Sequence, residues 1–229
     1  MRGGMAEQPA SDFVPAAPQL WTYDALSFLL TSARRWRPAL IAQIAPSPAD
    51  VIADIGCGTG TQLRLLARAC SSATLIGIDP DEAIRRRARA KLARMTPPAE
   101  LLAGYLRDTA NLLGGRGVTK VLSSLVFHQV PLDEKRAGLA AIHETLQPGG
   151  SLHVADYGLQ RTAKMRNRFR LVQKGDGFDN TEPNAQGVLP GLMADVGFGT
   201  VEETHVFETV SGSISIYRAV VHDRRAVDN

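Results

Sequence analysis

Through the middle of the chain, short apolar runs alternate with segments in which apolar residues recur every three or four positions. Short apolar runs are typical of buried strands, and the longer recurrence is typical of helices. The runs predict strands at Val51–Ile55, Leu75–Asp79, Glu100–Leu102, Val118–Leu125 and Ser151–Asp156. The periodic segments predict helices at Thr61–Cys70, Asp81–Met95 and Asp133–Gln147, with a short turn or helix near Asp108–Leu113. Because strands and helices alternate, we expect a parallel sheet with helices on both faces.

The two ends of the chain follow other patterns. From about Leu20 to Ile44 the apolar spacing predicts two helices, and Pro46 and Pro48 end that segment. Near the other end, a helix is predicted at Val188–Val196, and strands at Thr200–Val210 and Ile214–Val221 enclose Ser211-Gly212-Ser213. Two strands joined by so short a turn predict an antiparallel hairpin. We therefore expect an α/β, Rossmann-like, doubly wound fold. Its sheet is mostly parallel and seven-stranded, with a C-terminal antiparallel hairpin and an N-terminal helical cover.

The same patterns predict how the chain is divided. Residues 1–18 are rich in proline, alanine and glycine and are expected to form a flexible tail. Residues 19–48 are expected to form the helical cover, residues 49–221 the main domain and residues 222–229 a second tail. A length of 229 residues suits one sizeable domain with a core of its own.

Composition narrows the class of protein. No run of 18 apolar residues is present, and no apolar signal core follows Arg2, so neither a membrane span nor secretion is expected. Cys57 and Cys70 form no metal-binding or disulfide framework, which predicts a reducing cytoplasm and no metal site. The net charge of +3 permits anionic partners without requiring them.

Residues 51–60 carry the strongest chemical signal. An apolar run ends in Asp54, and Gly56, Gly58 and Gly60 follow at alternate positions before a predicted helix. Glycines let the backbone turn sharply and approach a ligand, and the helix start offers free N–H groups. The next strand ends in Asp79, where a carboxylate suits the two hydroxyls of a ribose. The pair predicts an adenosine-containing cofactor at the carboxyl ends of the strands.

Two kinds of cofactor fold share this pattern of strand, glycine turn and helix. A nicotinamide-binding fold would require Gly-x-Gly-x-x-Gly, and the last glycine would fall on Thr61. The order of the motifs instead resembles the class I S-adenosylmethionine-dependent methyltransferases. The resemblance rests on the segments Asp54–Gly60, Gly77–Asp79, Arg107–Leu112, Leu122–His128 and Leu146–Asp156. Arg107 and Lys120 depart from the usual glycine and aspartate.

Farther upstream, Tyr23-Asp24 followed by Trp36-Arg37 is similar to the N-terminal cover of the ubiquinone/menaquinone-biosynthesis type and of related phospholipid N-methyltransferases. The resemblance as a whole implies S-adenosyl-L-methionine as cofactor and S-adenosyl-L-homocysteine as product. It implies that Asp54 orders the loop and the methionine ammonium. The cofactor-binding residues it implies are Tyr23, Asp54, Gly56, Cys57, Gly58, Gly60, Asp79, Pro80, Asp108, Thr109 and Ser124.

Some of these residues also have structural interpretations. Asp79 can be a solvated residue at a helix start, where Pro80 suits the first turn. Asp108 and Thr109 either border the adenine or cap a helix.

Three residues at the ends of the fourth and fifth strands are candidate catalytic groups. His128 and Asp156 could each accept a proton from an attacking atom, and Tyr157 could line the pocket. Alternatively, these residues form structural hydrogen bonds in the wall of the cleft. Methyl transfer from a sulfonium releases a neutral thioether and depends mostly on alignment, so a base is optional.

A basic segment follows the fifth strand, in a region, 158–190, where the resemblance implies a lid over the substrate. Within 161–174, basic residues alternate with Met165, Phe169, Leu171 and Val172. Such a helix could rest on a membrane surface or grip an anionic substrate, or it could be an ordinary lid with a solvated face.

Three functions follow as alternatives. The first is a methyltransferase acting on carbon, oxygen or nitrogen of a small, partly apolar molecule. The second is a phospholipid or isoprenoid-quinone methyltransferase at a membrane surface, and the third is a non-catalytic cofactor-binding regulatory protein. No nucleic-acid partner is expected, because the Asn/Asp-Pro-Pro-Tyr turn of many nucleic-acid amino-methyltransferases is absent. The oligomeric state is left open.

Overall fold

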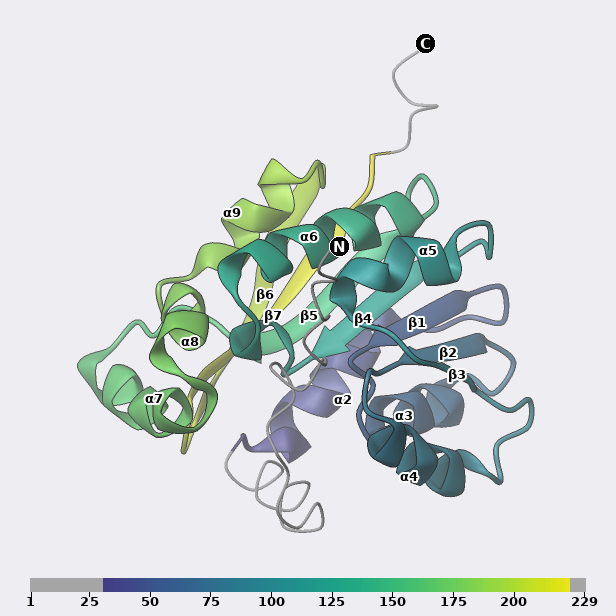
Figure 1. Ribbon diagram of the computed structural model, residues 1–229, viewed down its shortest axis with the longest axis horizontal. Helices are drawn as coiled ribbons and strands as arrows, with labels where there is room; N and C mark the ends of the chain where they lie inside the picture. Colours follow the sequence, from purple (N-terminus) through teal and green to yellow (C-terminus); the bar gives the residue numbers. More distant parts are fainter. Residues whose placement is uncertain (1–30, 223–229) are drawn as a thin grey trace, which may run out of the picture.

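The computed structural model describes residues 31–222, and its centre is one seven-stranded sheet (Figure 1). The strands are β1 (Val51–Ile55), β2 (Thr74–Ile78), β3 (Glu100–Leu102), β4 (Lys120–Ser124), β5 (Ser151–Tyr157), β6 (Thr200–Thr209) and β7 (Gly212–Val220). Their order in the sheet is β3-β2-β1-β4-β5-β7-β6. The first five strands are parallel, and β7 runs antiparallel to both β5 and β6. The expected fold class is confirmed.

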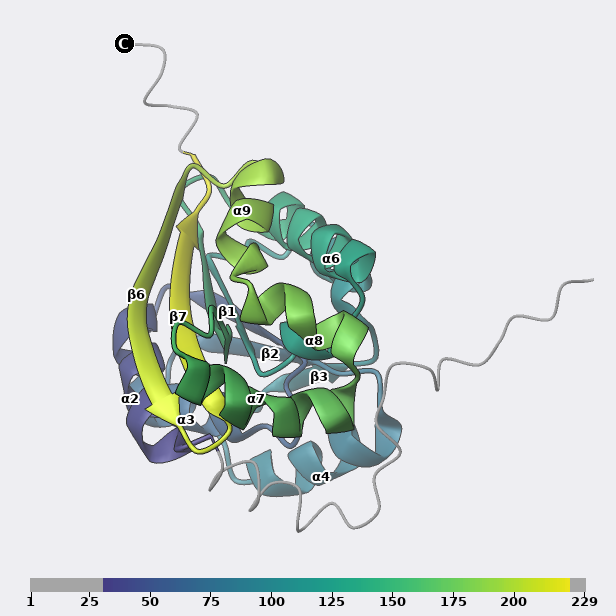
Figure 2. The same cartoon turned by 90° about the vertical axis from the view of Figure 1, so that its left-hand side faces the viewer.

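Helices cover both faces of the sheet, as the alternating pattern predicts (Figure 2). They are α2 (Ala33–Ile44), α3 (Thr61–Ala69), α4 (Glu82–Leu92), α5 (Thr109–Leu113), α6 (Leu132–Thr145), α7 (Ala163–Asp176), α8 (Phe178–Ala185) and α9 (Val188–Asp195). Two 3-10 turns, η2 (Leu106–Asp108) and η3 (Phe127–Gln129), follow β3 and β4. Buried side chains of α5, α6 and α9 form one core, and those of α2, α3, α4 and α7 form the other.

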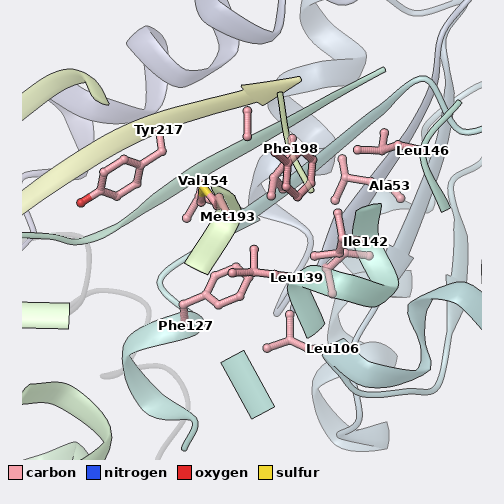
Figure 3. Packing of buried hydrophobic residues seen from close by; sticks show 14 of the residues in the cluster. Ala53, Leu106, Phe127, Leu139, Ile142, Leu146, Val154, Met193, Phe198 and Tyr217 are labelled. Atoms are coloured by element: carbon pink, nitrogen blue, oxygen red, sulfur yellow. The ribbon is translucent and has the colours of Figure 1, made fainter. Parts of the chain in front are cut away.

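The first of these cores is shown in Figure 3, where apolar side chains of β1 and β5 meet those of α6 and α9. Leu139 and Ile142 project from α6, and Met193 from α9, into the core beneath the sheet, which contributes Val154 (Figure 3). All four side chains are fully buried. Burying a side chain of this size stabilises the fold by about 1.5–3 kcal/mol. This apolar packing holds the sheet rigid beneath the loops at its edge.

The strand order places the ends of four strands together. β1 lies between β2 and β4, so successive crossovers leave it in opposite directions. In open α/β sheets, ligands bind in the crevice that this reversal opens at the carboxyl ends of the strands. Asp54, Asp79, Ser124 and Asp156 lie at or next to the carboxyl ends of β1, β2, β4 and β5. The topology therefore brings four of the predicted site residues to one edge.

Most element boundaries agree with the expectations to within two residues, and three differences have physical causes. The hairpin turns at Val210 and Ser211, and not at 211–213, because Gly212 already pairs with Thr209. Lys120 begins β4 two residues later than expected, because Val118 lies in the loop and packs into the core. Helix α8 carries Pro183 and a weak apolar pattern and was not predicted. Residues 20–30 of the predicted N-terminal helices lie outside the described residues. The first predicted tail, residues 1–18, lies outside them too, and of the second tail only His222 is described.

Candidate functional site

The glycine loop between β1 and α3 is fixed to the end of β2. The backbone N–H groups of Gly56 and Cys57 both donate to the Ile78 carbonyl oxygen, at 2.8 and 2.9 Å. Gly56, Gly58 and Gly60 have φ angles of 72°, 53° and 75°, which favour glycine. A Cβ at Gly56 would lie 2.3 Å from a Val126 methyl, so the loop packs directly against the turn after β4.

Asp79 connects this loop to the start of α4. Its Oδ2 accepts from the Gly58 N–H at 2.9 Å, and its Oδ1 accepts from the Asp81 N–H at 3.0 Å. Burial raises the pKa of this carboxyl, and the two N–H groups partly oppose the rise. A carboxylate oxygen can accept more than one hydrogen bond, so both oxygens retain capacity for hydroxyl donors. Asp79 thus both shapes the loop and can bind two hydroxyl groups.

Asp54 is the most unusual group of the site. Its side chain is 1% exposed, and neither carboxylate oxygen has a hydrogen-bond partner among the described residues. Burial, together with the nearby charge of Asp79, raises its pKa to about 8, and the Arg37 guanidinium opposes that rise. A buried carboxylate costs folding free energy unless a hydrogen-bond donor or a cation compensates for its lost hydration. The position is therefore suited to a cationic ligand group.

Two further polar residues lie on the helices that precede and follow β1 in the chain. Gln62, in the first turn of α3, is 4% exposed, and neither its amide nitrogen nor its amide oxygen has a partner among the described residues. Arg37 lies on α2, and its charge reaches Asp54. Gln62 was not predicted, because a single glutamine in an amphipathic helix carries no periodic signal.

The other predicted cofactor residues are placed as follows. The hydroxyl of Thr109 is buried and donates to the Leu106 carbonyl at 2.7 Å, and Asp108 accepts from the Tyr105 N–H at 2.9 Å. Both contacts belong to the η2 turn, which favours the capping interpretation of Asp108. Cys57 is buried in the loop, Pro80 precedes α4, Ser124 ends β4, and Tyr23 lies outside the described residues.

His128 and Asp156 lie together, but both are enclosed. Asp156 is fully buried and accepts from His128 Nδ1 at 2.6 Å. It also accepts from three backbone N–H groups, those of Val126, Phe127 and Tyr157, at 2.7 to 2.9 Å. These four donors occupy the carboxylate. The geometry favours a structural role for Asp156, and its role as a base stays a prediction.

The second nitrogen of His128 is also engaged. Nε2 lies 3.2 Å from an oxygen of Asp176, the last residue of α7, and the side chain of His128 is 3% exposed. Burial alone would lower the pKa of His128, but Asp156 and Asp176 together raise it to about 9. Tyr157 contacts the imidazole edge-on, with ring centroids 4.9 Å apart, and its hydroxyl pairs with Ser211 at 2.7 Å. Its position relative to a substrate stays a prediction.

A buried lysine completes this cluster. Lys135 of α6 is fully buried and donates to the carbonyls of Phe127 and Val130, both at 2.5 Å, and to that of Asn180, at 2.9 Å. Burial lowers its pKa to about 8. The sequence carried a signal for it, because Lys135, Leu139 and Ile142 share one helix face by spacing. Asp176 carried no such signal, because only packing brings α7 to η3.

The part of the chain that forms this site is similar to known methyltransferases. The family described as a methyltransferase domain matches residues 52–150, which include the glycine loop, Asp79 and η3. A trans-aconitate 2-methyltransferase from Afipia carboxidovorans is 34% identical over 134 residues, 58% of this chain and 49% of that protein. A ubiquinone/menaquinone biosynthesis C-methyltransferase from Syntrophotalea carbinolica is 26% identical over 94% of both chains. The match spans about half the length of several curated relatives, including the first of these two.

Solved structures share the fold. An O-methyltransferase family protein from Burkholderia thailandensis superposes with a TM-score of 0.65 and 18% identity, covering 88% of this chain and 60% of that one. A further structure, from Aquifex aeolicus and named as a SAM-dependent methyltransferase, gives 0.60 and 17%, covering 85% and 93%. Within residues 31–222, no helix is long and apolar enough to cross a membrane, and no acid, histidine or cysteine cluster could hold a metal.

Proposed function

We propose, from its confirmed resemblance to the class I S-adenosylmethionine-dependent methyltransferases, that this chain transfers a methyl group from S-adenosylmethionine to a small, partly apolar molecule. The relatives named for trans-aconitate and for ubiquinone/menaquinone biosynthesis support a small-molecule acceptor. The acceptor atom would be carbon, oxygen or nitrogen.

One observation supports cofactor binding above the others: the two buried oxygens of Asp54 that lack partners among the described residues. An α-ammonium group would supply both the missing charge and the missing donors. Asp79, one strand along, retains acceptor capacity for the two ribose hydroxyls. The residues present therefore fit S-adenosylmethionine, which supplies an electrophilic methyl group when it is bound.

The residues of this chain would contribute alignment and exclusion of water. The glycine loop and Asp79 fix the nucleoside end, and Asp54 fixes the amino-acid end. Holding two reactants in line can supply about 7–11 kcal/mol of the barrier, so no base is needed for a nucleophile that is already activated. His128 and Asp156 are occupied by each other and by backbone groups, which agrees with a reaction that relies on positioning.

Replacing Asp79 by alanine is expected to weaken binding of S-adenosylmethionine by about 1–3 kcal/mol, because the ribose hydroxyls lose their acceptor. Isothermal calorimetry on wild type and Asp79→Ala measures this change. Asp195→Ala, which removes an exposed acid on α9, is the matched control and should bind like wild type. Equal binding by Asp79→Ala would remove Asp79 from the cofactor site.

The same protein preparation distinguishes the enzyme from a cofactor-binding regulatory protein. A panel of small acceptors with a methyl-labelled cofactor should give turnover on at least one of them. Tight cofactor binding without transfer to any acceptor would favour the regulatory alternative.

A second candidate function, methylation of a phospholipid or isoprenoid quinone at a membrane surface, is favoured by the outer face of α7 and the start of α8. Leu171 and Phe178 are exposed there, at 58% and 60%, among the exposed Lys164, Arg170 and Lys174. Met165 and Phe169 are buried on the opposite side of the helix. Basic residues that surround exposed apolar side chains suit an anionic membrane surface.

Vesicle flotation tests this candidate. Wild type is expected to float with phosphatidylglycerol vesicles and not with phosphatidylcholine vesicles. The double variant Arg170→Glu/Lys174→Glu should bind at least roughly thirtyfold more weakly, because each basic residue near the surface contributes about 1 kcal/mol. The control variant Arg86→Glu/Arg94→Glu changes the net charge by the same amount. Arg86 is exposed on α4 and Arg94 is exposed just after it, so this variant should float like wild type. No association of wild type with anionic vesicles would remove this candidate.

A further inference from the structure

Helices α7 and α8 lie side by side at one end of the molecule (Figures 1 and 2). They follow β5 directly, beside the edge that carries the proposed cofactor site. Two polar contacts fasten them directly to η3, the turn after β4, and Lys135 of α6 adds a third by bridging η3 and α8. His128 contacts Asp176 of α7, Lys135 donates to the Asn180 carbonyl of α8, and the Asn180 amide donates to the Gln129 carbonyl at 2.9 Å. The turn η3 is therefore where these two helices attach to the site edge.

The contact of His128 is distinctive, because each ring nitrogen faces a carboxylate. Nδ1 lies 2.6 Å from Asp156, and Nε2 lies 3.2 Å from Asp176. A neutral imidazole has one N–H and one lone pair, so it could donate to only one of these acids. With both acids ionised, both contacts can be hydrogen bonds only when the ring carries two protons and a positive charge.

The position of Asp176 leads to the same conclusion. It is the last residue of α7, where the helix dipole is negative and disfavours an acid. An imidazolium ion next to it offsets that cost. Gly177, with a φ of 86°, then turns the chain directly into α8, so the contact lies at the corner between the two helices.

We propose that the His128 imidazolium is a latch that joins Asp156 of β5 to Asp176 of α7 and so holds the α7–α8 corner closed against η3. His128 and Asp176 are then positioning residues. The charged or titratable groups that face the ring are Asp156 and Tyr157 from β5, Asp176 from α7 and, at longer range, Lys135 from α6. If the proposed function holds, the latch also shapes the acceptor side of the site, but the contact itself does not depend on that function.

The latch makes closure depend on pH. The pKa of His128 is raised to about 9 in the folded protein. The charged ring therefore stabilises the closed corner fully at a pH below the ordinary histidine pKa near 6.5. The effect is lost as the pH rises through 9, when the ring loses a proton and one carboxylate loses its donor. Between these values the corner should loosen progressively.

Limited digestion with trypsin tests the latch, because α7 contains its own cleavage sites, among them Arg168, Arg170 and Lys174. In Asp176→Asn at pH 7, cleavage within α7 should be roughly fivefold faster than in wild type, relative to cleavage at Arg86 and Arg94 in the same digest. Asp179→Asn removes an exposed acid three residues later and should be cut like wild type. Raising the pH to 9.5 should bring wild type to the ratio of Asp176→Asn.

Nuclear magnetic resonance supplies a second readout that is independent of activity. The His128 ring resonance, assigned with His128→Gln, should titrate in Asp176→Asn about one pH unit or more below wild type. Equal α7 cleavage in Asp176→Asn and Asp179→Asn would overturn the latch. A parallel rise at α4 would also overturn it, because the contact would then support the whole fold. If the proposed function failed, with wild type and Asp79→Ala binding the cofactor equally, both of these readouts would be unchanged.

Discussion

Replacing Asp54 by asparagine is expected to abolish useful binding of S-adenosylmethionine and, at the same time, to stabilise the empty protein. The carboxylate is buried and has no partner among the described residues, so the ligand ammonium would be its main counter-charge. Removing one partner of a buried charge pair costs about 2–5 kcal/mol, which is roughly 30- to 5,000-fold in affinity. Calorimetry on wild type and Asp54→Asn measures this loss.

The gain in stability follows from the sign of the pKa shift. The folded-state pKa of Asp54, about 8, lies above the ordinary aspartate value of 3.8, so the folded protein holds a proton that the unfolded chain releases. Stability therefore falls as the pH rises from about 4 to 8. Asparagine cannot ionise, so at pH 8 the free energy of unfolding of Asp54→Asn should exceed that of wild type by about 5 kcal/mol.

A proton count distinguishes this account from simple loss of a contact. Binding of a cation should expel the Asp54 proton, so wild type at pH 7 should release about one proton per ligand. Calorimetry in two buffers of different ionisation enthalpy gives that number, and Asp54→Asn should release far less. Asp133→Asn, an exposed acid on α6, should match wild type in affinity and proton release. Unchanged affinity in Asp54→Asn would mean that the ammonium binds elsewhere.

Replacing Asp156 by asparagine is expected to cost about 3–5 kcal/mol of folding stability, because it leaves the imidazolium of His128 buried beside only one acid. The amide nitrogen would also face donors. Oδ1 and Oδ2 of Asp156 each accept two of the four hydrogen bonds, so either orientation of the amide sets N–H against N–H. Urea denaturation at pH 7 measures the change.

Asp195→Asn is the matched control, because it also removes an acid from an ion pair. Its pair with Arg136 is exposed on both sides, and such pairs contribute about 0–1 kcal/mol. If Asp156 were instead a base with little structural importance, Asp156→Asn would fold as stably as Asp195→Asn and lose only turnover. That result would restore the catalytic interpretation of the His128–Asp156 pair.

Local backbone chemistry explains why much of the site was predictable. Gly56, Gly58 and Gly60 have positive φ angles, which glycine adopts far more readily than other residues. The loop therefore requires glycines, and these mark it in the sequence itself. The strand before the loop is visible in the sequence as a short apolar run, and the helix after it as apolar residues at helical spacing. Asp79 and Asp156 could be assigned to strand ends because parallel strands place all their carboxyl ends at one edge.

The sequence alone thus determined the α/β sheet, the hairpin, the glycine loop and the strand-end acids, because each depends on residues close together in the chain. Only the tertiary structure decided the partners of His128, the burial of Lys135, the existence of α8 and the isolation of Asp54. The contacts of His128 and Lys135 join η3 to distant helices. Asp54 is isolated because none of the described residues around it donates a hydrogen bond to its carboxylate. Such relations arise from packing between distant segments, and no local pattern records them.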